Sequence, residues 1–415
     1  MKKTTLAGLL FLASLTLLAQ GTINTMFYNV LEFPSASPAN RELVLKNILS
    51  EYNPDIFMVC ELESVEGANL IQNVTFNSEN YAFDRAPFSA NQSSDSPLQQ
   101  MLYYRSNMFS LEDFSTILTN TRDINRYVLL LHTATSTTDP IHIYIYISHL
   151  KSSEGAANQL ERLDMVNRVT ADLETIPSNA FVLFAGDLNV YTAAEPAYME
   201  LTDPTNAITL QDPINTAGDW HNNNIFAGVH TQSTRVNSGA FGAGAGGGMD
   251  DRFDFILISE NMIASPKLRY VENSYKSFGN NGNCYDMDVN NPTCAGVFEQ
   301  ELRNNLYSMS DHLPVVMQLQ TNQEIILAGT DFDIPATQLK LKSTIVTQNI
   351  TLLSKTPLNG SFSFGIYNAL GQKVMEWNGN PSQEISVAIN TLTNGVYYIK
   401  TNLPNTEPLK FLKTS

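Results

Sequence analysis

The sequence predicts a layered α/β domain over residues 21–320, followed by a smaller domain of short strands. In the first part, short apolar runs rich in β-branched and aromatic residues alternate with amphipathic helical stretches. Past Thr321, a linker-like stretch leads to short strands separated by the Asn-Gly pairs Asn359-Gly360 and Asn394-Gly395, which are typical of turns between antiparallel strands. The chain's 415 residues are enough for about two to three domains.

The composition indicates an exported globular protein without a broad basic surface. Hydrophobic residues make up 43% of the chain, too many for a disordered protein, whereas charged residues make up only 16%. The 41 acidic and 24 basic residues give a net charge of −17, which argues against a passive nucleic-acid binder because phosphate affinity comes largely from Lys and Arg. The net charge does not exclude an enzyme that captures phosphodiesters locally through a divalent cation.

Residues 1–20 have the layout of a secretory signal peptide. Lys2 and Lys3 precede a short apolar core, Leu6–Ala19, and a small residue stands at its end. A buried N-terminal helix is the alternative. Because no later stretch is long and apolar enough to cross a bilayer, we expect an exported protein without stable membrane insertion.

Within the large domain, most elements can be assigned from the pattern of apolar residues. Arg41–Glu51 and Asn158–Leu173 have apolar residues three and four positions apart, as amphipathic helices require. Ile141–Ile147 and Phe181–Phe184 are nearly continuous apolar runs, which indicates central strands buried on both faces. The predicted strands are Thr25–Val30, Ile56–Cys60, Met101–Tyr104, Tyr127–His132, Ile141–Ser148, Phe181–Ala185, Phe253–Ile258 and Val315–Leu319.

The three cysteines fit an exported protein without requiring a disulfide scaffold. Cys60 lies in an apolar run and is predicted to be a small buried hydrophobe. Cys284 and Cys294 flank a polar loop and could pair after export. In the same loop, oxygen-bearing side chains stand at alternate positions, Asp286, Asp288 and Asn290, as they do in short calcium-binding loops. The loop is therefore a candidate site for structural Ca²⁺, and a plain solvated loop is the alternative.

Residues 238–248 form a glycine-rich loop directly before an acidic stretch. The loop carries no charge and no glycine pattern of a phosphate-binding turn after a strand. Two interpretations stay open, a mobile rim of an active site and a loop without a role.

Polar residues recur where apolar strands of the large domain end. Burying any one of them unpaired would cost several kcal/mol, so a shared cleft explains them better than six separate packing accidents. Oxygen ligands predominate and no Cys/His cluster has zinc spacing, which favours Mg²⁺, Mn²⁺ or Ca²⁺ and suits the attack of water on phosphorus. The residues are Asn29, Glu61, His149, Asp187 with Asn189, Asp254, and Asp311 with His312.

These residues, in their order and local motifs, resemble the endonuclease/exonuclease/phosphatase superfamily. The resemblance extends over about residues 24–320 and implies a four-layer α/β sandwich with two central β-sheets. The motifs are Asn29, Glu61 in Pro-Asp-Ile-x-x-x-x-Glu, Ser148-His149, Gly186-Asp187-Leu188-Asn189, Arg252-Phe253-Asp254 and Ser310-Asp311-His312.

The resemblance implies a site for Mg²⁺ or Mn²⁺. Glu61 matches the principal metal ligand, Asn29 helps to hold the ion or the phosphate, and Asp311 approaches a metal. The chain departs from many relatives at Cys60, where they have Gln, which puts a hydrogen bond to the metal-binding carboxylate in doubt.

The resemblance also implies catalytic roles. Asp187 matches the residue that orients and deprotonates the attacking water, with Asn189 hydrogen-bonded nearby. His312 and His149 match the pair that contacts the scissile phosphate, and Asp254 matches the carboxylate that supports His312.

Two further cations are candidates for substrate contact. Lys151 follows His149 in the chain, and Arg235 lies in the segment Thr231–Arg235. Both segments resemble stretches of exported bacterial members of the family, although exposed surface residues are the alternative.

Residues 340–415 resemble the type A sorting domain of the type IX secretion system. The resemblance rests on Phe364–Val374 and Leu392–Lys400 and implies export by that machinery to the cell surface or the medium. The alternative is a carbohydrate-binding β-sandwich. The predicted organisation is therefore a signal peptide at 1–20, a catalytic domain at 21–320, a linker at 321–339 and a small β-sandwich sorting domain at 340–415.

The function predicted from sequence is a secreted, metal-dependent phosphodiesterase, with a nuclease acting on extracellular DNA or RNA as the first choice. A sphingomyelinase-like lipid phosphodiesterase or another phosphoesterase is the alternative, although the sequence has no strongly aromatic loop for entering a membrane. A non-catalytic binding protein on the same scaffold is the third hypothesis. The oligomeric state does not follow from the sequence.

Overall fold

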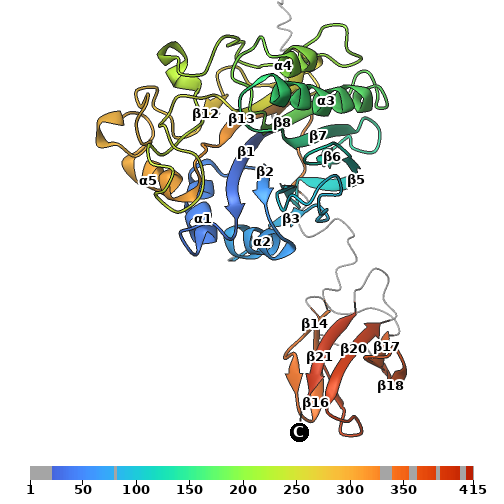
Figure 1. Cartoon of the computed structure of the whole chain (residues 1–415). Coiled ribbons are helices and arrows are strands. Elements are labelled where there is room, and N and C mark those ends of the chain that lie inside the picture. Colours follow the sequence, from blue (N-terminus) through green and yellow to red (C-terminus); the bar gives the residue numbers. More distant parts are fainter. Residues whose placement is uncertain are drawn as a thin grey trace, which may run out of the picture. The chain divides into compact units, whose positions relative to one another are not determined.

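The computed structural model describes residues 21–78, 82–327, 339–354, 362–379, 384–401 and 408–414. The predicted signal peptide, most of the predicted linker and the Asn359-Gly360 turn lie outside these residues. The chain divides into two compact units, Met1–Leu327 and Ala328–Ser415 (Figure 1).

The first unit contains a seven-stranded sheet built around the first strand of the chain. Strand β1 pairs with β2 in parallel and with β13 antiparallel, so the N-terminal strand lies between an early and a late segment. The order is β11 (Arg269–Tyr270), β13 (Val315–Thr321), β1 (Gly21–Phe33), β2 (Ile56–Leu62), β4 (Gln99–Arg105) and β3 (Phe83–Arg85), with β12 (Lys276–Ser277) also on β13.

A second sheet of six strands carries the other predicted strands. Its central pair, β7 and β8, is parallel, and β10 lies antiparallel to β8. The order is β5 (Phe109–Ile117), β6 (Ile124–Leu131), β7 (Ile141–His149), β8 (Phe181–Asp187), β10 (Asp254–Ser259) and β9 (Leu210–Gln211).

The two sheets face each other between layers of helices, which confirms the predicted four-layer α/β fold. Ile143, Ile145 and Ile147 of β7 belong to a hydrophobic cluster shared with β1, β2 and the helices α1 (Arg41–Tyr52) and α5 (Gln300–Met309). Tyr146, on the opposite face of β7, belongs to a second cluster with α3 (Ala156–Leu173) and α4 (Pro196–Leu201). Figure 1 shows α3 and α4 over β7 and β8, and α1 beside β1. Alternate residues of one strand therefore face different layers, since successive strand side chains point to opposite faces.

The predicted strands and both predicted helices are present, with boundaries extended by a few residues. The longest elements not predicted from the sequence are β5 and α5, because β5 carries Glu112 and Asp113 and α5 is polar on its exposed side. The remaining helical turns are α2 (Val65–Leu70), the π-helix η1 (Ile71–Phe76), and the 3₁₀-helices η2 (Asn224–Val229), η3 (Glu260–Ile263) and η4 (Pro292–Cys294).

The second unit has two small β-sheets around its own hydrophobic cluster, as expected for a small β-sandwich. Asn394 and Gly395 do not close a hairpin, because they connect β19 of one sheet to β20 of the other. The hairpin of β17 and β18 turns instead through Asn368 and Gln372, which bond through their backbones. The strands are β14 (Leu339–Leu341), β15 (Ile345–Val346), β16 (Asn349–Ser354), β17 (Phe362–Asn368), β18 (Lys373–Gly379), β19 (Glu384–Ala388), β20 (Gly395–Thr401) and β21 (Leu409–Lys413).

A disulfide joins Cys284 and Cys294, whose Cα atoms are 5.2 Å apart. The enclosed loop is tied to a neighbouring segment, since Asp288 Oδ1 accepts a 2.7 Å hydrogen bond from the Val236 N–H. Cys60 is fully buried, as predicted, and is a free thiol. The structural Ca²⁺ site in this loop stays a prediction. Among the residues that the structure describes, no helix is long and apolar enough to span a bilayer.

Candidate active site

The strand-end residues singled out from the sequence converge at one place between the two sheets. His149 and Asp187 are the last residues of β7 and β8 and lie opposite each other in the parallel register. Asp254, the first residue of β10, lies opposite Asp187 on the other side. On the facing sheet, Asn29 of β1 lies opposite Cys60 of β2, one residue before Glu61. Neighbouring strands thus deliver these side chains to one site.

Glu61 leaves the regular path of its strand. Its φ of +61° lies in the left-handed region, and the pairing of β2 with both neighbours shifts register around this position. Such irregularities redirect a side chain that regular pleating would place elsewhere, and they are common near active sites. The irregular end of β2 brings the Glu61 carboxylate within hydrogen-bond distance of Asn29.

Glu61, His149 and Asp187 form a cluster that could hold a metal ion. One ligand atom from each lies within 4.8 Å of the others. His149 Nε2 is 3.5 Å from Asp187 Oδ2 and 3.9 Å from Glu61 Oε1. His149 and Asp187 are almost completely buried.

Asn29 holds the two carboxylates of this cluster together. Its Nδ2 donates to Glu61 Oε1 at 2.8 Å and to Asp187 Oδ2 at 3.1 Å. Its Oδ1 accepts a hydrogen bond from the Leu31 N–H. In this structure Asn29 therefore presents its amide N–H groups, rather than a free oxygen, to the cluster.

His312 approaches the cluster from the chain segment before β13. Its Nδ1 forms a 2.7 Å hydrogen bond with Asp254 Oδ2, and its Nε2 lies 3.6 Å from Asp187 Oδ2. Ser310 connects this segment to β1, because its hydroxyl donates to the Asn29 carbonyl and accepts from the His312 N–H.

Burial and nearby charges shift the pKa values of His149 and His312 in opposite directions. Burial lowers the pKa of His149 well below its usual value, and the nearby charges of Arg122 and His312 lower it further. For His312, burial acts in the same direction, but the carboxylates of Asp254 and Asp187 outweigh it and raise the pKa well above its usual value. His149 is therefore neutral near neutral pH, and His312 is an imidazolium.

The pKa values of the carboxyl groups of Asp187 and Glu61 are both raised. Burial and the nearby charges of Asp254 and Glu61 raise the pKa of Asp187 to about 7, against the lowering effect of His312. Burial and the charge of Asp311 likewise raise the pKa of Glu61. Without a cation, these acids repel one another in a poorly solvated site.

Asn189 and Asp311 lie beside this centre. The Asn189 N–H donates to Asp187 Oδ1 at 3.1 Å, and its side chain donates to the Leu150 carbonyl. Asp311 Oδ2 accepts a 2.6 Å hydrogen bond from the Ala245 N–H. In the described part of the chain, Asp311 Oδ1 is buried and has no hydrogen-bond partner.

Of the two cations predicted to contact substrate, Arg235 is instead buried and bonded within the protein. Its side chain is fully buried, donates through Nε to the Tyr307 carbonyl at 2.9 Å and stacks on Phe241. A guanidinium enclosed in this way is not available to a substrate. Lys151 is half-buried, and its Nζ donates to the Ser152 carbonyl.

Two residues that sequence reasoning did not single out also reach the centre. Gln232 Nε2 lies 2.6 Å from His312 Nε2, although the Thr231–Arg235 segment had been noted only for its arginine. Arg122 donates to the carbonyls of His149 and Leu150 and so supports the end of β7. No local pattern marks either residue, because both act on partners more than 25 positions away.

A divalent cation fits this donor set. The cluster offers carboxylate oxygens and a neutral imidazole nitrogen at ligand spacing. Asp311 Oδ1 is an orphaned buried acceptor, and such an atom costs free energy unless a cation or donor reaches it. The carboxylate oxygens of the cluster suit a hard divalent cation.

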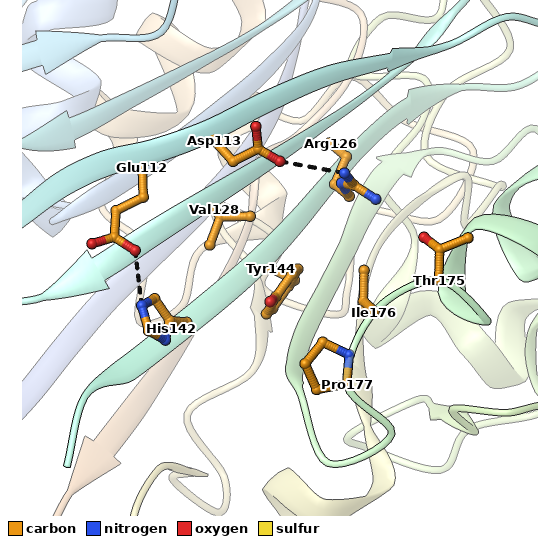
Figure 2. A pocket seen from close by; sticks show the side chains of 9 residues that line it. All are labelled: Glu112, Asp113, Arg126, Val128, His142, Tyr144, Thr175, Ile176 and Pro177. Atoms are coloured by element: carbon orange, nitrogen blue, oxygen red, sulfur yellow. Dashed lines mark hydrogen bonds and ion pairs between the residues drawn. The ribbon is translucent and has the colours of Figure 1, made fainter.

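The pocket in Figure 2 lies elsewhere, on strands β5, β6 and β7. It has a volume of about 390 Å³ and contains no residue of the cluster. Its charged groups are already paired, Glu112 with His142 at 2.8 Å and Asp113 with Arg126 at 3.3 Å. The lining is Glu112, Asp113, Arg126, Val128, His142, Tyr144, Thr175, Ile176 and Pro177.

Comparison with known sequences identifies the C-terminal region. Residues 346–412 match the family model of the secretion system C-terminal sorting domain. This match confirms the predicted type IX sorting domain and an extracellular or cell-surface location. No curated protein matches the chain in sequence.

Several solved structures resemble the chain at low sequence identity. The catalytic domain of human Nocturnin is 14% identical, with a TM-score of 0.45 over 72% of this chain and 94% of its own. A humanized TDP2 from D. rerio is 16% identical, with a TM-score of 0.45 over 72% and 99%. An endonuclease/exonuclease/phosphatase family protein from Bacteroides thetaiotaomicron is 13% identical, with a TM-score of 0.46 over 73% and 98%.

Proposed function

We propose that this protein is a secreted, divalent-metal-dependent phosphodiesterase that acts as a nuclease on extracellular DNA or RNA. One observation carries the proposal: Glu61, His149 and His312, each from a separate segment, surround Asp187. One ligand atom each of Glu61, His149 and Asp187 lies within 4.8 Å of the others, and Nε2 of His149 and of His312 lies 3.5 and 3.6 Å from Asp187 Oδ2. Two buried carboxylates, a neutral imidazole and an imidazolium are a suitable set for attack of water on a phosphodiester.

Glu61 would be the principal ligand of Mg²⁺ or Mn²⁺. It is common to both candidate ligand sets, the one predicted from the sequence with Asn29 and Asp311 and the cluster with His149 and Asp187. A bound divalent ion would neutralise charge that develops on the phosphate oxygens. It would also oppose the effects of burial and of neighbouring negative charge, which raise the pKa of both Glu61 and Asp187.

Asp187 is assigned as the general base. Its pKa of about 7 suits a group that takes a proton from water near neutral pH. Asn189 fixes Oδ1 through its N–H, and Asn29 approaches Oδ2. Oδ2, which accepts a hydrogen bond from Asn29, is also the oxygen that faces both histidines, and this supports its role towards the attacking water.

His312 is assigned to the phosphate. Asp254 holds its Nδ1–H. The Nε2 of His312, which faces Gln232 and Asp187 in this structure, would turn to a phosphate oxygen, where the imidazolium would stabilise negative charge. His149, kept neutral by burial, is assigned as the second group that contacts the phosphate. Asp254 acts through His312 and is a positioning residue.

The proposal is tested by digestion of supercoiled plasmid and of single-stranded RNA with residues 21–415. We expect cleavage with millimolar Mg²⁺ or Mn²⁺, none with EDTA, and weaker cleavage at higher salt because salt screens the local attraction between the phosphates and the cation of the site. His312→Ala should cut the rate by about 10²-fold or more. His142→Ala, at the start of the same domain's β7 and in the pocket of Figure 2, is the matched control and should stay near full rate.

The outcomes separate the hypotheses. Cleavage that survives complete chelation would reject the metal role. No cleavage of either nucleic acid by a folded, metal-loaded protein would reject the nuclease, and the same enzyme would then be assayed on sphingomyelin vesicles and a chromogenic phosphodiester. Inactivity on all of these would favour a binding protein on the same scaffold.

A further inference from the structure

The glycine-rich loop, residues 238–248, folds against Asp311 instead of extending freely into solvent. The Ala245 N–H donates to Asp311 Oδ2 at 2.6 Å, and Gln232 Nε2 approaches the same oxygen at 3.4 Å. These contacts occupy Oδ2 and leave Oδ1, which is buried and without a partner among the described residues. The loop thus binds one oxygen of the Asp311 carboxylate and leaves the other without a hydrogen bond to any described residue.

Gly244 allows this close approach. A Cβ built at Gly244 would lie 2.9 Å from Asp311 Cγ and 3.0 Å from Oδ2, closer than real Cβ contacts. Its φ of +90° is also one that residues other than glycine rarely adopt. Any larger residue would therefore have to displace the Asp311 carboxylate or the loop.

The loop is itself anchored on the segment that carries Gln232. Ser233 Oγ donates to the Ala245 carbonyl at 2.9 Å, directly behind the N–H that binds Asp311. The Arg235 guanidinium stacks on Phe241 at 4.4 Å. The Gly248 N–H donates to the Arg235 carbonyl. A loop held at Phe241, Ala245 and Gly248 can fix a carboxylate more firmly than a mobile rim could.

We infer that the glycine-rich loop is a backbone clamp that orients Asp311, directing its unpaired oxygen to the divalent cation of the site. The inference rests on the proposed metal-dependent function, and it concerns a part of the chain that the function itself did not explain. Asp311 is close enough to Glu61 for its charge to affect that carboxyl group. The loop residues are positioning residues, because they act on the cation through Asp311.

The loop contains its own control. Gly242 also has a positive φ, +76°, but no atom of the described residues lies within 4 Å of a Cβ built there. Gly244→Ala and Gly242→Ala therefore impose similar backbone strain, and they differ in the contact with Asp311. The measurement is the affinity of residues 21–415 for Mn²⁺ alone, by calorimetry or by electron paramagnetic resonance, without nucleic acid.

We expect Gly244→Ala to weaken Mn²⁺ binding by about tenfold or more, and Gly242→Ala to leave it within about twofold. Ala245→Pro, which removes the donating N–H, should weaken binding as Gly244→Ala does. The melting temperature in EDTA should fall for both glycine variants, and by more for Gly244→Ala because of its clash with Asp311. In an Asp311→Ala background, Gly244→Ala should have no further effect on Mn²⁺ affinity, because its target is gone.

Equal Mn²⁺ affinities of the two glycine variants would overturn the inference, as would the absence of saturable binding to the unaltered protein. If Gly244→Ala does not fold, the Asp311→Ala/Gly244→Ala variant decides, because removing the carboxylate should restore folding if the clash with Asp311 is the cause. Failure to restore it would also reject the clamp. If the variants show the expected differences in Mn²⁺ affinity but the protein cleaves no nucleic acid, the proposed nuclease function is rejected and the inference about the loop stands.

Discussion

Two buried polar groups of the first unit differ in whether their charges are compensated. Arg252 and Asp212 form a bidentate ion pair at 2.8 and 3.0 Å, and the guanidinium packs over Phe255 at 4.3 Å. Although burial alone would raise the pKa of Asp212, Arg252 keeps it below its usual value. In the cluster of Glu61 and Asp187, burial instead raises the pKa of both acids. The first group is complete in the folded chain, whereas the proposed cation would complete the second.

The largest expected difference follows from changing one carboxylate in each group. Asp187→Asn should lower the catalytic rate by about 10³-fold, because the base is lost, without destabilising the metal-free protein. Asp212→Asn should lower the free energy of unfolding by about 3–5 kcal/mol, since it leaves the Arg252 charge buried and unpaired. Thermal or urea unfolding in EDTA, beside a plasmid assay, measures both effects.

The same variant tests the division of roles inside the cluster. Asp187→Asn should retain Mn²⁺ binding if Asp187 is the base and Glu61 the principal ligand. Loss of Mn²⁺ binding would make Asp187 a ligand instead. A metal-free Asp187→Asn protein as unstable as Asp212→Asn would show that the contrast between the two groups is wrong.

A smaller effect is expected at the pair of Asp254 and His312. Asp254→Asn keeps the shape of the side chain but removes the charge that holds the His312 imidazolium. We expect the rate to fall by about 10²-fold, and the pH above which activity declines to move downward because the His312 pKa falls. A pH–rate profile that keeps its position would contradict the role of Asp254 as the partner of His312.

The pH dependence of stability sharpens the comparison further. The folded pKa of Asp187, about 7, lies above the unfolded value of about 4, so the contribution of this group is present below about pH 4 and lost as the pH rises through 7. In EDTA the melting temperature should therefore fall between pH 5 and 8 by more in the unaltered protein than in Asp187→Asn. Saturating Mn²⁺ should remove the difference. Parallel curves in EDTA would contradict the raised pKa.

The smallest effect is expected at the exposed end of β7. His142 is 35% exposed and pairs with Glu112, whereas His149, on the same strand, is nearly buried in the cluster. His142→Ala should change the free energy of unfolding by less than about 1 kcal/mol and leave cleavage unchanged. His149→Ala should abolish most of the activity. Comparable losses for both would indicate that the pocket of Figure 2 takes part in catalysis.

The fold of the first unit could be predicted well because its signals are local. The apolar runs of β7 and β8, and the helical spacing of α1 and α3, are visible in short windows of sequence. Polar residues at strand ends then indicated a shared site, since neighbouring strands of one sheet bring their ends together.

The sequence by itself determined which residue types are available at the strand ends and, through the family resemblance, their candidate roles. Only the tertiary structure decided how each one is used. It buried Arg235 against the Tyr307 carbonyl, although the cation had suggested a substrate contact. It placed Gln232 beside His312 and turned the glycine-rich loop onto Asp311. The physical reason is that hydrogen bonding, burial and pKa depend on partners far apart in the chain, and no local pattern specifies those partners.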